Sequence, residues 1–250
     1  MTIAAAQLAR HRGSYGVDAP YVPALMGAAG LVSLAVGGVS WFLGLPGLAI
    51  PATYLGAFFV LSTADYLYAS IFGKFGVWAE LLASLDLEGD EQVLDMGCGR
   101  GAVLCMVARL LPRGRAVGID LWKTADQSGN SPEATGRNAE AEGVADRIEL
   151  RTGDMRAMPF PDGSFDLVIS SLAIHNITDA AGRAKATDEA ARVLRPGGTL
   201  LIVDISAMRE YEERLRQHGL SELARRPLGT RMWFGGPWVA ASLVRARKAG

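Results

Sequence analysis

The sequence is poor in cysteine and histidine and carries almost no net charge. Its two cysteines, Cys98 and Cys105, are seven positions apart, which gives neither a C-x-x-C motif nor a disulfide framework, so we expect a reducing compartment. We predict no metal site. The formal net charge of −1 over 250 residues gives no electrostatic reason to expect a nucleic-acid partner. These absences argue against a secreted disulfide-bonded domain, a metalloprotein and a nucleic-acid binder.

Charge is missing altogether from one long stretch, since no charged residue and no histidine occurs between Asp18 and Asp65. The segments Val22–Leu45 and Gly47–Gly73 are both apolar, and a turn at Pro46 separates them. The first segment is 24 residues long, or ~36 Å of helix, whereas a bilayer core needs about 20 residues. We therefore predict a helical hairpin, packed through small residues, that spans the membrane.

The hairpin divides the chain into three expected parts. These are an N-terminal segment (residues 1–20), a hairpin that anchors the chain in membrane lipid (21–73) and a folded domain (74–250). Two arginines before the hairpin and a lysine after it place both termini and the folded domain in the cytoplasm. Three other interpretations stay open: a signal peptide, two buried helices that form a lid over the site, and a hairpin that stays within one leaflet.

After the hairpin, predicted strands alternate with predicted helices. The strands are 92–96, 116–122, 147–154, 164–174 and 199–206, and the helices are 76–87, 102–111, 132–142 and 179–194. Two final segments, 220–233 and 238–248, have no predicted helix between them and indicate an antiparallel pair at the edge of the sheet. This order predicts an α/β fold with a mostly parallel sheet, helices on both faces, and ligands at the carboxyl ends of the strands.

The first predicted strand runs into a glycine-rich loop, in the stretch EQVLDMGCGRG (Glu91–Gly101). Gly97, Gly99 and Ala102 formally fit the G-x-G-x-x-A fingerprint of dinucleotide-binding proteins. Other ligands without phosphates also need a loop with few side chains at the end of a strand. The loop alone therefore does not tell a dinucleotide from another nucleoside ligand.

The wider pattern resembles class I methyltransferases, which bind S-adenosylmethionine. The stretch DMGCGRG resembles their signature, and the other motifs follow in order over roughly residues 76–250. These motifs are Asp120 at the end of the second strand, Gly153-Asp154-Met155 after the third, Asp162–Asp166 before the fourth and Arg192–Gly198 before the fifth. Together they resemble the branch that contains the ubiquinone/menaquinone biosynthesis C-methyltransferases. The resemblance implies a Rossmann-like sheet whose last strand is antiparallel.

The resemblance also implies the cofactor and its contacts. S-adenosylmethionine carries a sulfonium and an ammonium, so the acidic Asp95 suits it and would suit a pyrophosphate poorly. Asp120 would accept hydrogen bonds from both ribose hydroxyls, while Asp154 would contact the adenine amino group with Met155 against the ring. The cofactor-binding residues implied are Asp95, Gly97, Cys98, Gly99, Gly101, Asp120, Leu121, Gly153, Asp154, Met155 and Ser170. S-adenosylhomocysteine would be the product.

A candidate catalytic group follows the fourth strand. His175, next to Asn176, stands where the substrate pocket opens in this family, and it could serve as a general base or orient the acceptor. The alternative is a structural histidine that caps a buried carbonyl. Tyr15 and Asp18 are either a lid over the cofactor or a plain linker. The polar stretch Asp126–Ser131 has no predicted role beyond a loop and a helix cap.

These observations predict a membrane-anchored methyltransferase whose domain faces the cytoplasm. The expected acceptor is a small, lipophilic molecule: a quinone precursor, an isoprenoid, a lipid or a thiol. The hairpin is a departure from the quinone methyltransferases, which are generally soluble, and it leaves the acceptor and the methylated atom open. Two alternatives remain, a non-catalytic membrane-tethered S-adenosylmethionine-binding module and a dinucleotide-dependent oxidoreductase. The sequence gives no prediction of the oligomeric state.

Overall fold

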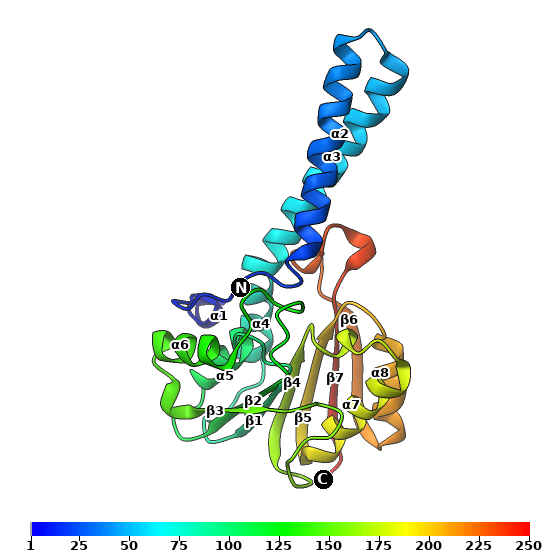
Figure 1. Cartoon of the computed structure of the whole chain (residues 1–250). Coiled ribbons are helices and arrows are strands. Elements are labelled where there is room, and N and C mark those ends of the chain that lie inside the picture. Colours follow the sequence, from blue (N-terminus) through cyan, green and yellow to red (C-terminus); the bar gives the residue numbers. More distant parts are fainter. Residues whose placement is uncertain (1) are drawn as a thin grey trace.

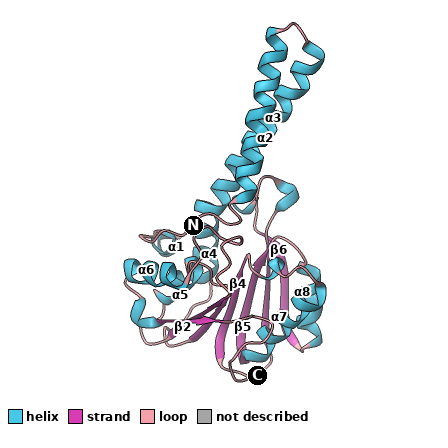
Figure 2. Cartoon of the chain, viewed as in Figure 1, coloured by secondary structure: helices cyan, strands magenta, loops and turns pink. Residues whose placement is uncertain are grey.

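Two long antiparallel helices project from a domain built on one sheet (Figure 1). The structure is a computed structural model that describes residues 2–250. Helices lie on both faces of the sheet (Figure 2). The C-terminus lies at the end of the domain farthest from the projecting hairpin.

Seven strands form the sheet in the order β3-β2-β1-β4-β5-β7-β6. The strands are β1 (Gln92–Met96), β2 (Arg115–Asp120), β3 (Ile148–Thr152), β4 (Phe165–Ser171), β5 (Leu194–Asp204), β6 (Leu220–Pro227) and β7 (Ser242–Lys248). Strands β1 to β5 pair in parallel, and β7 pairs antiparallel with both β5 and β6. The predicted fold class is confirmed, including the antiparallel pair at one edge. The carboxyl ends of the parallel strands meet on the side from which the hairpin leaves (Figure 1).

Each face of the sheet has its own hydrophobic core. On one face lie α4 (Lys74–Ala83), α5 (Ala102–Ala108) and α6 (Pro132–Glu142), with Trp78 and Leu104 fully buried. On the other lie α7 (Ala180–Val193) and α8 (Met208–Gln217), with Ala190 and Tyr211 buried. The strands supply apolar side chains to both cores alternately, as Val93 and Leu94 do in β1. The site-bearing edge of the sheet therefore rests on a rigid three-layer support.

Local signals in the sequence set the helix ends near the site. The Ser131 hydroxyl accepts a hydrogen bond from the Ala134 amide at 3.1 Å, Pro132 occupies the first turn, and Gly143 ends α6 at a φ of 71°. Helix α7 begins in the same way at Asp179, whose carboxylate accepts from the Gly182 amide at 2.6 Å. Both helices match their predicted ranges closely.

Several element boundaries differ from the prediction. Helix α8 and the short helix α1 (Ile3–Ala9) were not predicted. In α8 the buried Met208, Tyr211 and Leu215 have helical spacing, but charged neighbours hide it. Strand β5 begins at Leu194, because Leu194 already pairs with Phe165 ahead of the Pro-Gly-Gly stretch. Strand β6 ends at Pro227, and residues 228–241 form a loop with two short 3₁₀ turns.

The hairpin consists of α2 (Tyr21–Phe42) and α3 (Pro46–Tyr68), joined by a three-residue turn. A π-helical turn, η1 (Ala69–Gly73), continues α3 directly into α4, so one helix runs from Pro46 to Ala83. The predicted boundary between hairpin and domain at residue 73 thus falls inside a continuous helix. The hairpin is held to the domain by helical backbone rather than by a flexible linker.

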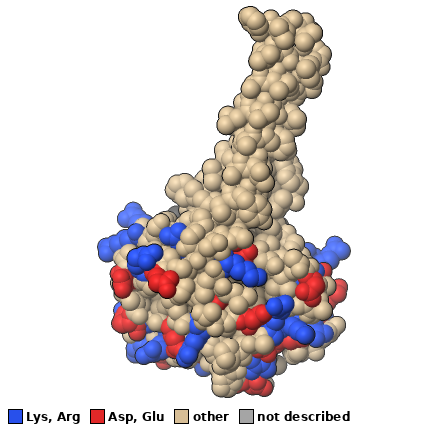
Figure 3. All heavy atoms as spheres, in the orientation of Figure 1, with Lys and Arg blue, Asp and Glu red and all other residues tan. Residues whose placement is uncertain are grey.

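The hairpin surface is apolar and exposed. Both helices are long and apolar enough to cross a membrane by length and composition, and only 17% of each apolar window is buried. Side chains such as Leu31 and Leu61 are 67% and 70% exposed. The space-filling view shows charged atoms on the domain and none on the visible face of the hairpin (Figure 3). This exposure disagrees with the interpretation of two buried helices that form a lid.

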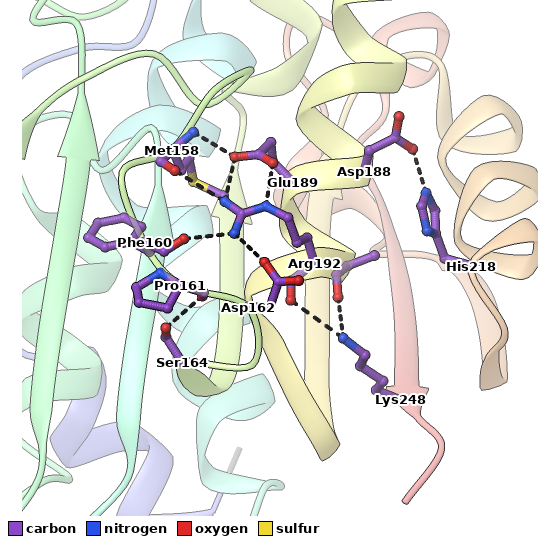
Figure 4. A network of polar contacts seen from close by, with 11 residues as sticks. Met158, Phe160, Pro161, Asp162, Ser164, Asp188, Glu189, Arg192, His218 and Lys248 are labelled. Carbon is purple, nitrogen blue, oxygen red and sulfur yellow. Dashed lines mark hydrogen bonds and ion pairs between the residues drawn. The ribbon is translucent and has the colours of Figure 1, made fainter.

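The motifs before β4 and β5 contact each other at the far end of the sheet (Figure 4). The Arg192 guanidinium donates to the Phe160 carbonyl at 2.7 Å and pairs with Asp162 at 2.8 Å. It also pairs with Glu189 at 2.6 Å, one turn earlier in α7. These residues therefore hold the loop before β4 against α7, which is a structural role.

Candidate active site

A cavity of about 270 Å³ opens at the carboxyl edge of the sheet. Nine of the eleven predicted cofactor residues line it: Asp95, Gly97, Cys98, Gly99, Asp120, Leu121, Gly153, Asp154 and Met155. The remaining lining includes residues from the hairpin base, the loop after β2 and the loop after β4. The structure thus brings together residues from six separate stretches of the sequence.

The glycine loop forms the floor of the cavity. Gly97 donates to the Ile119 carbonyl at 2.8 Å, and Gly99 donates to Asp120 Oδ2 at 2.9 Å. Both have left-handed backbone conformations, with φ of 73° and 53°. A Cβ on Gly97 would collide with Ala173, and one on Gly99 with the Gln127 side chain. The chain's own packing therefore keeps side chains out of this floor.

Asp95, the last residue but one of β1, is 99% buried, and its Oδ1 has no hydrogen-bond partner among the described residues. Burial and, next, the charge of Asp120 raise the pKa of Asp95 to about 8. A buried carboxyl oxygen without a partner is costly, so a donor that reaches it from the cavity would be strongly favoured. An ammonium group supplies such a donor together with a compensating charge.

Asp120 is held in place from three sides. Its Oδ1 accepts from the Trp122 amide at 2.6 Å and from Asn130 Nδ2 at 3.2 Å, while its Oδ2 accepts from Gly99. Two acceptor positions of Oδ1 are thus already used, and Oδ2 retains one. Asn130 belongs to the polar stretch that had no predicted role, and the structure shows that it orients Asp120.

The loop after β3 supplies the opposite wall. Asp154 pairs with Arg156 at 2.6 Å, and that hydrogen bond lowers the pKa of Asp154. Met155 lies beside Gly97, whose added Cβ would come 3.1 Å from the methionine methyl group. Leu121, 47% exposed, lies on the β2 side. The wall thus combines an ion pair with apolar side chains.

The Cys98 thiol is buried at the floor, where burial and the nearby Asp95 raise its pKa well above the ordinary value. The thiol therefore stays neutral, as a packing group. Gly101 and Ser170 lie outside the cavity lining. Gly101 precedes α5 at a φ of 81°, and the Ser170 hydroxyl donates to the Met96 carbonyl at 3.0 Å. Gly101 thus sets the start of α5, and Ser170 joins the ends of β4 and β1 behind the cavity.

His175 also lies outside the lining, although its neighbour Asn176 is part of it. The His175 amide donates to Asp204 Oδ2 at 3.0 Å, and its ring Nδ1 contacts Asp204 Oδ1. Burial acts to lower the pKa of His175, but the hydrogen bond and the charge of Asp204 outweigh it, so the pKa is raised. Asp204, 1% exposed at the end of β5, also accepts from the Tyr211 hydroxyl at 3.4 Å. The sequence analysis missed Asp204, although its position as an acidic residue at the end of a strand could have identified it as a candidate site residue.

The N-terminal segment closes one side of the cavity. Asp18 lines it and pairs with the buried Lys74, the first residue of α4, at 2.8 Å to each carboxylate oxygen. Asp18 also accepts from the Ser70 hydroxyl at 2.9 Å. Gln127 joins this segment to the glycine loop, because its Nε2 donates to the Tyr15 carbonyl and its Oε1 accepts from the Arg100 amide. Sequence reasoning missed Lys74 and Gln127.

The cavity is acidic. Six aspartates line it against two lysines and one arginine, and two of those three bases are paired with aspartates. Burial raises the pKa of Asp126, which is one of these six aspartates. Among residues 2–250 there is no group of three side chains able to hold a metal. An acidic cavity suits a cationic ligand and opposes a pyrophosphate, which disfavours the dinucleotide interpretation.

Comparisons with known proteins agree with this geometry. Residues 94–202 match the family model described as methyltransferase domain. The ubiquinone/menaquinone biosynthesis C-methyltransferase UbiE of Roseobacter denitrificans is 32% identical over 53% of this chain and 50% of its own length. A demethylmenaquinone methyltransferase of Lactiplantibacillus plantarum is 31% identical over 51% of this chain and 50% of its own length. This chain thus spans about half the length of these curated relatives.

A similar fold occurs in a geranyl diphosphate methyltransferase solved in complex with SAM. Its TM-score is 0.57 at 17% identity, over 74% of this chain and 90% of that one. The family match begins in β1 with Leu94 and ends in β5 with Ile202, so it spans the glycine loop and the strand ends that form the cavity. Residues 94–202 of this chain, which carry most of the cavity, are therefore similar to the methyltransferase domain family, and the fold is the one seen in that solved methyltransferase.

Proposed function

We propose that this chain is a membrane-anchored methyltransferase that moves a methyl group from S-adenosylmethionine to a small, lipophilic acceptor. One observation supports this proposal above the others: the cavity and the hairpin share an edge of the sheet. Lys74 follows the hairpin helix directly and also lines the cavity. An acceptor that leaves the bilayer beside the hairpin would therefore meet the cavity without crossing bulk water.

The chain's residues fit the cofactor. When bound, S-adenosylmethionine supplies a methyl group already activated by a sulfonium. The unpaired Oδ1 of Asp95 would accept a hydrogen bond from the ammonium, and Asp120 Oδ2, which among the described residues accepts only from Gly99, would accept one from a ribose hydroxyl. The carboxylates of the lining favour the positive charge. Most of the chain's contribution to the rate would then be orientation, which can supply ~7–11 kcal/mol.

We propose that His175, which Asp204 holds next to the lining residue Asn176, orients the acceptor. Asp204 holds the imidazole through Nδ1, which leaves Nε2 for an acceptor oxygen or proton. Asn176 and Thr178, on the same loop, line the cavity and offer further polar groups. His175 would act as a base only where the acceptor must lose a proton.

The lipophilic acceptor is inferred from two sources. The first is the uncharged, exposed hairpin beside the cavity. The second is the names of similar proteins, which mention ubiquinone, menaquinone and geranyl diphosphate. Each molecule so named carries an apolar isoprenoid chain. We infer the same broad class for this chain and leave its methylated atom open.

A screen for S-adenosylhomocysteine release tests the proposal. The full chain in detergent is incubated with S-adenosylmethionine and either fractionated membrane lipids or a panel of water-soluble acceptors. The proposal predicts turnover with at least one lipid fraction, and a clear loss in the variant His175→Ala. Cofactor binding without turnover on any acceptor would support a non-catalytic binding module instead.

A further inference from the structure

The loop between β6 and β7 is unusual for a loop, because all of its residues after Arg231 are uncharged. No charged residue occurs between Arg231 and Arg245, and the run Met232–Val244 includes Trp233, Phe234 and Trp238. The Trp238 side chain is 61% exposed. Surface loops are normally polar, so an uncharged loop with an exposed tryptophan needs an apolar or interfacial neighbour.

This loop lies alongside the hairpin. In Figure 1 the orange-red segment reaches up next to the lower part of α2 and α3. Trp238 faces Phe58 of α3 with ring centroids 5.4 Å apart, and Phe234 meets Tyr66 edge-on at 5.4 Å. Gly235 lies against both helices, since a Cβ there would be 3.0 Å from the Met26 methyl carbon and 3.5 Å from the Ser62 carbonyl oxygen. The loop therefore contacts the hairpin at three positions.

The lower end of the loop is fixed to the hairpin base. Gly73 packs so closely on the Arg231 carbonyl that a Cβ there would collide with it. The Arg231 guanidinium pairs with Glu80 of α4 at 2.5 Å. The charged Arg231 thus stays on the domain side, while the uncharged residues that follow it extend along the hairpin.

The position of Phe58 relates the loop to a bilayer. Phe58 lies ten residues from Tyr68, or ~15 Å along the helix. If the membrane surface lay at Phe58, only Pro46–Phe58, or ~20 Å, would remain to enter a core of ~30 Å. If it lies at Tyr21 and Tyr68, the 23 residues of α3 give ~35 Å, which matches the core. The exposed Leu25 and Leu61, which lie nearer to the domain than Phe58 does, then also face lipid.

We propose that the β6–β7 loop is a third membrane-embedded element and that Trp238 inserts into lipid beside the hairpin. This inference rests on the proposed membrane anchoring and adds a surface to it. The domain then sits with the carboxyl edge of its sheet against the bilayer, rather than at a distance on a stalk. The loop contributes lipid contact on the side of the hairpin formed by α3.

Depth-dependent quenching tests the proposal. Trp238→Cys in the full chain is labelled with bimane and reconstituted into phosphatidylcholine vesicles with or without doxyl-labelled lipid. Leu31→Cys, in the middle of α2, reports on the hairpin, and Ala249→Cys, at the far end of the domain, reports on water. The unaltered chain, whose Cys98 and Cys105 are buried, gives the labelling background. Pro237→Cys, also exposed, is a second loop position if Trp238→Cys does not fold.

The expected result is that doxyl lipid quenches the labels at positions 238 and 31 to a similar extent, while aqueous iodide quenches only the label at 249. Quenching of positions 238 and 237 by iodide but not by doxyl lipid, with position 31 quenched by lipid, would overturn the loop proposal and leave the anchor intact. Absence of lipid quenching at position 31 would instead overturn the anchoring itself.

Discussion

Asp95 combines two properties that a purely structural residue would not have. It is almost completely buried, and one carboxyl oxygen has no partner among the described residues. An unsatisfied buried polar group costs about 1–3 kcal/mol, more if charged. A bound ligand would remove this cost by donating a hydrogen bond to the unpaired oxygen. The cofactor assignment therefore depends on Asp95 more than on any other residue.

Replacing this carboxyl tests the assignment. The variant Asp95→Asn keeps the shape but loses the charge, so we expect the affinity for S-adenosylmethionine to fall by about 10- to 100-fold, since hydrogen bonds to charged groups contribute about 1.5–3 kcal/mol. Calorimetric titration of the full chain in detergent measures it. Ser164→Ala, at the opposite end of the sheet, is the control and should bind like the unaltered chain. Equal affinities in all three would show that the ammonium binds elsewhere.

The raised pKa of Asp95 has a consequence for pH. With a pKa of about 8 in the free protein, Asp95 is mostly protonated at pH 7. A cationic ligand binds the ionised form, so binding at pH 7 should release roughly 0.9 proton, and affinity should weaken as pH falls below 8. Titrations in buffers of different ionisation enthalpy measure the proton release. Asp95→Asn should release none, and a release that persists in this variant would contradict the assignment.

The His175–Asp204 pair makes a separate prediction. Asp204 raises the pKa of His175 above 6.5, so a general base at this position loses activity as pH falls through that raised value. In Asp204→Asn burial remains while the charge is gone, so the inflection in kcat/KM should move to lower pH. In His175→Ala it should disappear. An identical pH profile in all three proteins would mean that His175 has only a structural role.

Among the elements, the hairpin depends on close helix packing at its glycines. A Cβ on Gly37 would lie 2.5 Å from Thr53 Oγ1, whereas one on Gly38 would meet nothing within 4 Å. Helices associate in a membrane largely through such small-residue contacts. Gly37 therefore tests the packing of the two helices, and the neighbouring Gly38 serves as its matched control.

We expect Gly37→Ala to destabilise the hairpin by about 1–2 kcal/mol, as overpacking does. Gly38→Ala should be neutral or stabilising, because alanine is the better helix former by about 1 kcal/mol. Unfolding in mixed detergent–SDS micelles, followed by circular dichroism, measures both. Equal effects of the two substitutions would contradict the observed packing of α2 on α3.

The strand and helix order followed from local signals. Periodicity, proline at the start of α6 and glycine after it act over a few residues, so the sequence predicts them well. Asp95, Asp120 and Asp154 were found because they lie at or just after strand ends in a recognisable pattern. Lys74, Gln127 and Asn130 were not, because their roles come from contacts across the chain, such as Gln127 with Tyr15. Helix α8 was missed although its apolar spacing was present.

At the scale of the whole molecule, the pair of the buried Lys74 and the partly buried Asp18 joins the N-terminal segment, the hairpin base and the cavity. Removing Lys74 leaves the partly buried Asp18 carboxylate without its cation, which typically costs about 1–3 kcal/mol. We therefore expect Lys74→Met to lower the free energy of unfolding by about that amount, and Asp18→Asn with Lys74→Met to regain part of it. Denaturant titration in detergent measures both, and an unchanged Lys74→Met would contradict the coupling.

The proposed function depends on the hairpin and the cavity lying at the same edge of the sheet. Gly27 and Thr63 face each other across α2 and α3, with an added Cβ on Gly27 3.7 Å from the threonine. Residues 28–62 can therefore be replaced by a short turn that preserves the base of the hairpin with Tyr66 and Ser70. This shortened chain keeps the contacts of Asp18 while it removes the surface that would enter lipid.

The most direct test of the account compares the full chain with this shortened chain. Both receive methyl-labelled S-adenosylmethionine and the same acceptor, offered once in lipid vesicles and once dissolved in detergent-free buffer as a water-soluble analogue. The account predicts equal cofactor affinity and equal rates on the soluble analogue, but a loss of about tenfold or more on the vesicle-bound acceptor, because the anchor raises the effective concentration at the membrane. Equal rates on both forms of the acceptor would contradict it.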